Sequence, residues 1–157
     1  MKEIKLTQGK IAIVDDEDYE RLNQYKWLAS WDGYNWYAVR KYSENGKQRN
    51  MFMHREILNA QKGTITDHRN GNGLYNCKEN IRLCTTQENA FNRKRATKKN
   101  KIGIKGVYWR KDIKKFAAMI KINYKQIFLG FFNVLGDADS AYRKAEEKYF
   151  GEFARKY

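Results

Sequence analysis

The sequence predicts an α+β fold in two small modules. Three observations predict it: short runs rich in aromatic and β-branched residues between turn signals, a basic stretch without large apolar residues past the middle, and a helical apolar stripe near the end. A length of 157 residues allows one modest core or two small ones. The chain has no proline, so we expect Gly, Asn, Asp and Ser to form its turns.

The N-terminal module begins with a short strand and a helix. Residues 11–14 (IAIV) predict the strand, and residues 15–25 predict a helix with an acidic first turn, which favourably opposes the positive end of the helix dipole. The same acids form a carboxylate cluster of the kind that binds metal ions. The helix start is our preferred interpretation of these acids.

A β-rich segment follows this helix. Residues 27–42 are rich in Trp, Tyr, Val and Ala, and Asp32-Gly33 interrupts them as the turn of a hairpin does. Asn45-Gly46 marks a second turn, before a segment that starts near Met51. The helical spacing of the next apolar residues predicts a helix over residues 54–60.

A basic linker precedes the C-terminal module. It begins at Arg93 with RKRATKKNK, which holds six bases and no acid, and we divide the chain into residues 1–92, 93–103 and 104–157. The last module is predicted to contain strands over residues 105–111, 116–122 and 126–132 and a helix over residues 137–150. We predict that one stripe of this helix packs on a three-stranded antiparallel sheet. The stripe consists of Ala138, Ala141, Tyr142, Ala145 and Tyr149.

Charge and composition limit the partners. The net charge is +14, and residues 92–125 hold thirteen bases against Asp112 alone, so a polyanion such as nucleic acid is the first partner to consider. No apolar run is long enough for a membrane span or a secretory signal, so we expect no membrane contact and a cytoplasmic protein. Cys77 and Cys84 lack the paired spacing of zinc ligands, and we expect two reduced, buried thiols and no zinc.

The most specific motif spans residues 67–92, DHRNGNGLYNCKENIRLCTTQENAFN. It resembles the HNH endonuclease motif of the phage and homing type, in which a strand carries Asp-His, an Asn pins a second strand and a final helix returns a His or Asn to a metal ion. Asp67 and His68 match the first element, Asn80 matches the pinning Asn, and Asn89 matches the last position. The resemblance implies a ββα-metal core with these four residues at the active site.

These residue types suit the hydrolysis of a phosphodiester. A neutral imidazole with a pKa near ~6.5 accepts a proton from water at neutral pH, which is the role that the resemblance implies for His68. The carboxylate of Asp67 and the amide oxygen of Asn89 are ligands that hard cations prefer, so we expect one Mg²⁺ or Mn²⁺ ion per active site. Many HNH proteins have His in the last position, and Asn there favours Mg²⁺ over softer metals.

Three further residues are candidates for supporting roles. A His-Arg pair, here His54-Arg55, recurs upstream of the motif in related phage HNH proteins. His54 either supports the active site, contacts a phosphate or is a structural residue at a helix start. Asn92 lies on nearly the same helical face as Asn89 and is the alternative metal ligand, although the spacing favours Asn89.

The module from Gly106 resembles the plant ethylene-response (Apetala-type) DNA-binding domain, which lays a three-stranded sheet into the major groove. Its landmarks here are Gly106-Val107, residues 116–118, Leu129-Gly130 and residues 138–142. Alternation predicts one wet basic face and one apolar face, with Phe131 on the apolar side. The candidate DNA contacts are Tyr108, Arg110, Lys115, Lys121, Gln126 and Phe128 on the sheet, with Arg93, Lys94 and Arg95 in the linker. Met119 and Gln126 differ from the plant pattern, so the plant target sequence is not carried over.

Taken together, these features predict a metal-dependent endonuclease, of the homing type, that cuts double-stranded DNA as a monomer or homodimer in a bacterium or phage-infected cell. A DNA-binding regulator with an inactive HNH core is the alternative, which the intact Asp67, His68 and Asn89 disfavour. An RNA-binding protein would account for basic patches with aromatic residues but leaves the metal-site pattern unexplained.

Overall fold

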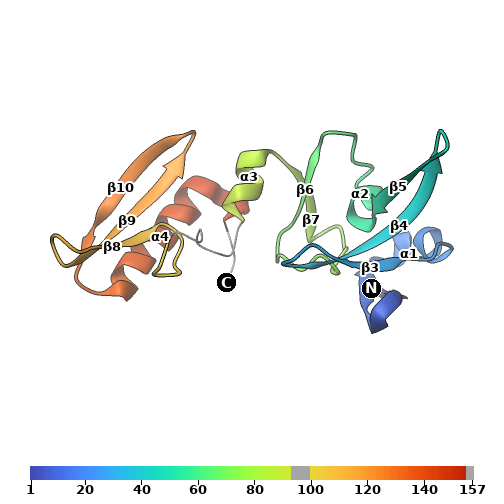
Figure 1. Ribbon diagram of the computed structural model, residues 1–157, viewed down its shortest axis with the longest axis horizontal. Helices are drawn as coiled ribbons and strands as arrows, with labels where there is room; N and C mark the ends of the chain where they lie inside the picture. Colours follow the sequence, from blue (N-terminus) through green and yellow to red (C-terminus); the bar gives the residue numbers. More distant parts are fainter. Residues whose placement is uncertain (93–99, 155–157) are drawn as a thin grey trace. The chain divides into compact units, whose positions relative to one another are not determined.

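The computed structural model describes residues 1–92 and 100–154, and it divides into two compact units, Met1–Thr85 and Thr86–Tyr157 (Figure 1). Each unit has its own hydrophobic core. The fold is mixed α+β with small antiparallel sheets. The linker candidates Arg93, Lys94 and Arg95 lie outside the described residues.

The first unit contains three small sheets and two helices. The strands β1 and β2 form one sheet, β3, β4 and β5 form a second in that order, and β6 pairs with β7. In chain order the elements are β1 (Lys2–Lys5), β2 (Ile11–Val14), α1 (Asp16–Asn23), β3 (Leu28–Trp31), β4 (Trp36–Glu44), β5 (Lys47–Phe52), α2 (Met53–Ile57), β6 (Ile65–His68) and β7 (Ile81–Cys84). A short 3-10 turn, Thr7–Gly9, joins the first two strands.

The core of the first unit forms around Trp27, which is 1% exposed. Its indole Nε1 donates a hydrogen bond to the carbonyl of Leu22 at 2.9 Å, which satisfies the one polar group that burial of the ring would leave unpaired. The remaining buried members come from both N-terminal sheets and from α1 and α2: Ile4, Leu6, Ala12, Val14, Leu22, Ala29, Ala38 and Met53. The strand β1 was not predicted, because its sequence KEIK contains one apolar residue, Ile4.

The second unit is a three-stranded sheet covered on one face by a helix. The sheet order is β10-β9-β8, with both pairs antiparallel. The elements are α3 (Thr86–Phe91), β8 (Val107–Arg110), β9 (Lys115–Ile122), β10 (Lys125–Phe132), α4 (Leu135–Phe150) and the 3-10 turn Gly151–Phe153. The buried core consists of Val107, Ala118, Ile120, Ala138, Tyr142, Ala145 and Phe150.

The packing stripe of α4 differs from the prediction at its end. Ala138, Tyr142 and Ala145 are buried as expected, but Tyr149 is 39% exposed and Phe150 takes the core position instead. Phe150 stacks on Phe91 of α3, with ring centroids 3.7 Å apart. In the last turn of the helix, the buried position therefore shifts by one residue, from Tyr149 to Phe150.

Residues 100–106 pack within the second unit. The side chain of Asn100 donates to the carbonyl oxygens of Ile104 and Val107, at 2.6 and 2.9 Å. Gly106 has a φ of +73°, and a Cβ at this position would lie 1.9 Å from the ring of Tyr142. Glycine is therefore required here both by its backbone conformation and by the close approach of α4.

Two further predictions concern the burial of the two cysteines and the length of apolar helices. Cys77 is fully buried as expected, whereas Cys84 is only half-buried at the end of β7. The two cysteines do not form a disulfide. Among the described helices, none is long and apolar enough to cross a membrane.

Candidate active site

The strands β6 and β7 form an antiparallel pair that brings Asp67 opposite Arg82 and His68 opposite Ile81. Asp67 and His68 are both buried, at 8% and 5% exposed. Arg82 Nε and Nη2 donate to Asp67 Oδ2 at 3.0 and 2.8 Å, which compensates the charge of the buried carboxylate. This ion pair fixes the Asp67 side chain at the end of the strand.

The imidazole of His68 is held by a polar contact and two ring contacts. Its Nε2 lies 3.1 Å from Oδ1 of the fully buried Asn76. Its ring centroid lies 4.7 Å from that of His54, edge to face, and 5.9 Å from that of Tyr37. Burial lowers the pKa of His68, and the bond to Asn76 and the charge of Asp67 oppose this shift. The ring is therefore neutral at pH 7, the state that a general base requires.

Asn80 closes the loop that leaves His68. Its Oδ1 accepts a hydrogen bond from the backbone N–H of Asn70 at 3.0 Å, and its Nδ2 donates to the carbonyl of Tyr75 at 2.7 Å. The backbone N–H of Arg69 also donates to the carbonyl of Asn80, at 2.7 Å. One amide side chain thereby joins the start, the middle and the end of the loop between the two strands.

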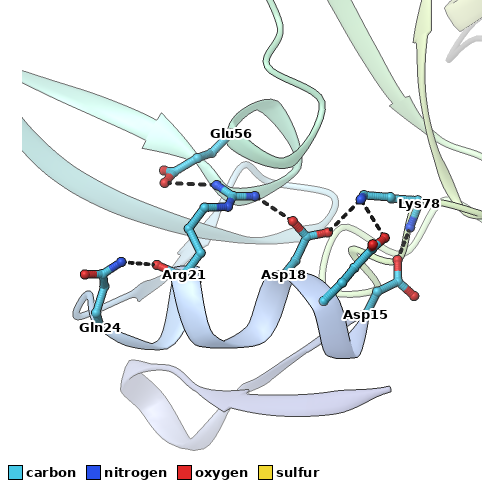
Figure 2. Close-up of polar contacts among 7 residues, drawn as sticks. Asp15, Asp18, Arg21, Gln24, Glu56 and Lys78 are labelled. Carbon is cyan, nitrogen blue, oxygen red and sulfur yellow. Dashed lines mark hydrogen bonds and ion pairs between the residues drawn. The ribbon is translucent and has the colours of Figure 1, made fainter.

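The N-terminal strand β2 supports the same loop. Ile13 N–H donates to the carbonyl of Leu74 at 2.9 Å, and Asn76 N–H donates to the carbonyl of Ile13 at 2.7 Å. The backbone N–H of Lys78 donates to Asp15 Oδ2 at 2.7 Å (Figure 2). These bonds give β2 and Asp15 a definite role, because they hold the loop that carries Asn76, which contacts His68.

The acidic cluster at the start of α1 surrounds a lysine ammonium group. Among the described residues, Asp15, Glu17 and Asp18 are the one group of three acidic, His or Cys side chains close enough to share a cation. Lys78 Nζ lies 2.6 Å from Glu17 Oε1 and 3.5 Å from Asp18 Oδ2, and Figure 2 shows Arg21 on the other side of Asp18. The cluster therefore neutralises protein cations and holds the loop, and its acids lie at the start of α1, where the helix-start interpretation places them.

His54 and Arg55 lie on α2, next to the Asp67-His68 strand. Burial lowers the pKa of His54 to about 3, with smaller contributions from His68 and Arg55. Its Nδ1 is buried and has no hydrogen-bond partner in the described part of the chain. Arg55 donates to the carbonyls of Thr64 and Gln61 at 2.6 and 2.9 Å, so its guanidinium ties α2 to the turn before β6.

Asn89 and Asn92 belong to the other unit, on α3 and directly after it. The site within the first unit consists of Asp67, His68, Asn76 and Asn80, with His54 and Tyr37 around the imidazole. Asn76 and Tyr37 were not predicted, because nothing in the sequence marks them: Asn76 resembles ordinary turn material, and Tyr37 is one of several strand aromatics. For a metal ion, Asp67 offers a carboxylate, the kind of oxygen ligand that Mg²⁺ prefers.

The second unit presents an open sheet face opposite α4. The predicted contacts Tyr108, Arg110, Lys115, Lys121, Gln126 and Phe128 share this face by strand register. Arg110 forms an ion pair with Asp112 at 2.7 Å.

Phe131 was expected on the apolar side of the sheet, and this prediction was wrong. A bulge between Phe128 and Gly130 shifts the register, so Phe131 pairs with Ala117 on the open face. Phe128 and Phe131 form an exposed pair with ring centroids 4.7 Å apart.

Two known proteins are similar to the chain in sequence. The chain is 33% identical over 94 residues to Protein 3.8 of Escherichia phage T7, an alignment that covers 60% of this chain and 76% of that protein. It is 27% identical over 149 residues to a protein of Acanthamoeba polyphaga mimivirus named an uncharacterized HNH endonuclease, covering 94% of this chain and 74% of the relative. No family model matches the chain. No solved structure matches it either.

Proposed function

The chain belongs to the same family as Protein 3.8 of Escherichia phage T7, and we propose that it is a metal-dependent DNA endonuclease of the HNH type. The observation that carries the proposal is the buried His68, neutral at pH 7 and bonded to Asn76, directly after the carboxylate of Asp67. The name of the mimivirus relative supports the same class of activity.

In this proposal His68 removes a proton from the attacking water. In the tautomer whose Nε2–H donates to Asn76 Oδ1, Nδ1 is the basic nitrogen of the ring. When the imidazole takes up the proton, the amide oxygen of Asn76 and the nearby charge of Asp67 stabilise the cation that forms. Asn80 holds the backbone on both sides of this arrangement through its two side-chain hydrogen bonds.

Asp67 and Asn89 are the residues that would hold one Mg²⁺ or Mn²⁺ ion, and such an ion would supply positive charge next to the phosphate. Arg82 orients the Asp67 carboxylate and compensates its burial. His54 is proposed as a positioning residue, since its ring packs edge to face on His68. Asn92 stays the alternative to Asn89.

Double-stranded DNA is the proposed substrate, held by the open face of the second unit. Residues 86–157 contain eighteen Lys and Arg against seven Asp and Glu, whereas residues 1–85 contain fourteen against eleven. The excess positive charge is therefore concentrated in the C-terminal part of the sequence, from which phosphate contacts would provide sequence-independent affinity. A homing-type enzyme, cutting as a monomer or homodimer, is the specific form of the proposal.

Cleavage of a supercoiled plasmid in Mg²⁺, with and without a chelator, tests the proposal. Wild-type protein should convert the plasmid to nicked or linear product in Mg²⁺ only, and His68→Ala should remove this activity while it leaves DNA affinity nearly intact, because the base acts on water. Cleavage by His68→Ala within about threefold of wild type would exclude His68 from the mechanism. DNA binding without any cleavage would instead favour the regulator with an inactive core.

A further inference from the structure

The two faces of the β4–β5 hairpin differ in how many of their exposed side chains have polar partners. Strand register places Lys41 opposite Asn50 and Ser43 opposite Gln48. These four side chains, which we call the open face of the hairpin, are all exposed. They form no hydrogen bond or ion pair within the described residues, and the face contains no acid.

Most side chains on the opposite face of the hairpin have partners within the described residues. Arg49 pairs with Glu44 at 3.5 Å across the strands. Arg40 donates to Glu56 at 2.8 Å and lies over the ring of Tyr25 at 4.3 Å. The two faces have similar exposure near the tip, so exposure alone does not explain why all four side chains of the open face lack such partners.

The open face continues the surface that contacts the two histidines. Side chains alternate along a strand, so Tyr37 and Val39 share a side of β4 with Lys41 and Ser43. Tyr37 contacts both His54 and His68, and Phe52, on the same side of β5, contacts His54. A duplex lying across His68 would therefore meet the open face as it extends along the hairpin, whose tip projects past α2 in Figure 1.

The chemistry of the open face is that of base recognition. A two-stranded β-ribbon fits the major groove, where Lys pairs with guanine, Asn and Gln pair with adenine, and Ser accepts several bases. With Lys41 as its only charge, the face has little capacity for phosphate binding and much for hydrogen bonding to base edges. Nothing in this set of residues favours an apolar or basic protein partner.

We propose that the β4–β5 hairpin enters the major groove and reads DNA sequence beside the cleavage site. A strand rises about 3.3 Å per residue, so Lys41 and Ser43 lie roughly 13 and 20 Å along β4 from Tyr37. At about 3.4 Å per base pair, these distances correspond to roughly four to six base pairs. The position relative to the cut rests on the proposed function, whereas groove binding by the hairpin does not.

Binding by the full chain in the presence of a chelator separates the two claims, because it requires no cleavage. Sequences are first selected by wild-type protein from a pool of random 40-base-pair duplexes. The Gln48→Ala, Asn50→Ala double variant should bind a selected duplex about tenfold more weakly than wild type, and its sequence preference at adjacent positions should be relaxed. Its affinity for unselected duplexes should change little. Lys41→Ala should weaken binding, whereas Lys47→Ala, an equal loss of charge on the opposite face, should stay within about twofold.

Cross-linking gives a second, independent readout. With a photoreactive amino acid at position 43, irradiation should attach the protein to a selected duplex, and the same amino acid at position 44, on the other face, should attach several times less. Equal cross-linking at both positions, or open-face variants that behave like Lys47→Ala, would overturn the proposal. Cross-linking to single-stranded RNA but not to duplex DNA would also overturn it. If the protein binds and cross-links but never cuts, the hairpin proposal stands and the nuclease proposal fails.

Discussion

The imidazole rings of His54 and His68 lie edge to face with centroids 4.7 Å apart, and both are buried. Two rings this close cannot both be protonated at low cost, because each would place a positive charge beside the other in a poorly solvated site. His54, which has the pKa of about 3, is the ring that stays neutral. The neutral His54 ring therefore packs against His68 and orients the proposed base.

The buried His54 should make the fold sensitive to acid. Its pKa is about 3 in the folded state and near 6.5 in the unfolded chain, so the unfolded chain binds more protons between these values and stability falls as pH falls below about 6.5. At pH 5 the loss from this residue is about 2 kcal/mol. His54→Leu should show a smaller loss, measured as urea midpoints at pH 7 and pH 5. Equal pH dependence in both proteins would show that His54 is hydrated in solution.

Asn80→Ala should lower stability by about 1 to 3 kcal/mol, because it leaves the Asn70 N–H and the Tyr75 carbonyl without their partner. Asn80→Asp keeps the acceptor and loses the donor, so its melting temperature should lie between those of Asn80→Ala and wild type. Thermal melts by circular dichroism measure both. If Asn80→Ala melts normally but fails to bind Mg²⁺, the roles assigned to Asn80 and Asn89 have been exchanged.

Gly73→Ala should also damage the loop, through close packing. A Cβ on Gly73 would lie 2.4 Å from the carbonyl oxygen of Trp36 and 2.5 Å from the ring of Tyr37, so the loop would move away from β4. We expect a loss of about 1 to 3 kcal/mol, together with reduced cleavage. Gly136→Ala is the matched control: it meets nothing within 4 Å in the first turn of α4 and should leave stability unchanged or raise it by up to about 1 kcal/mol. Equal melting of the two variants would contradict the tight contact.

The local parts of the site could be predicted from the sequence, and the long-range parts could not. Asp67 and His68 at the end of a strand follow from a short motif, as does the position of Asn80 before the paired strand. The bond from Lys78 to Asp15 joins residues 63 positions apart, so nothing nearby in the sequence indicates it. The acids of α1 allowed two interpretations for this reason, and the structure adds a lysine from the distant loop as their partner.

Strand alternation failed at one position, where the backbone departs from regular pairing. Gly130 has a φ of +140°, a conformation open to glycine, and the register shifts between Phe128 and Gly130. A single glycine in an apolar run signals such a bulge only weakly, so Phe131 was assigned to the wrong face. The structure adds it to the surface proposed to hold DNA.

This reassignment leads to a test of the second unit. Phe128 and Phe131 are 53% and 46% exposed, so replacing either with alanine should change the melting temperature little. If the open sheet face holds DNA, Phe131→Ala should lower the affinity for duplex DNA several-fold, because the ring loses apolar contact with thymine methyl groups and sugars in the groove. Tyr124→Ala is the matched control, since Tyr124 is 91% exposed in the turn between β9 and β10, outside the paired strands. Fluorescence anisotropy with a labelled duplex, in chelator and at two salt concentrations, measures the affinity. Loss of a phosphate contact would change the salt dependence of binding, whereas loss of an apolar contact would not. Full affinity in Phe131→Ala would place the DNA on another surface of the unit, and the register shift at Gly130 would then serve the fold alone.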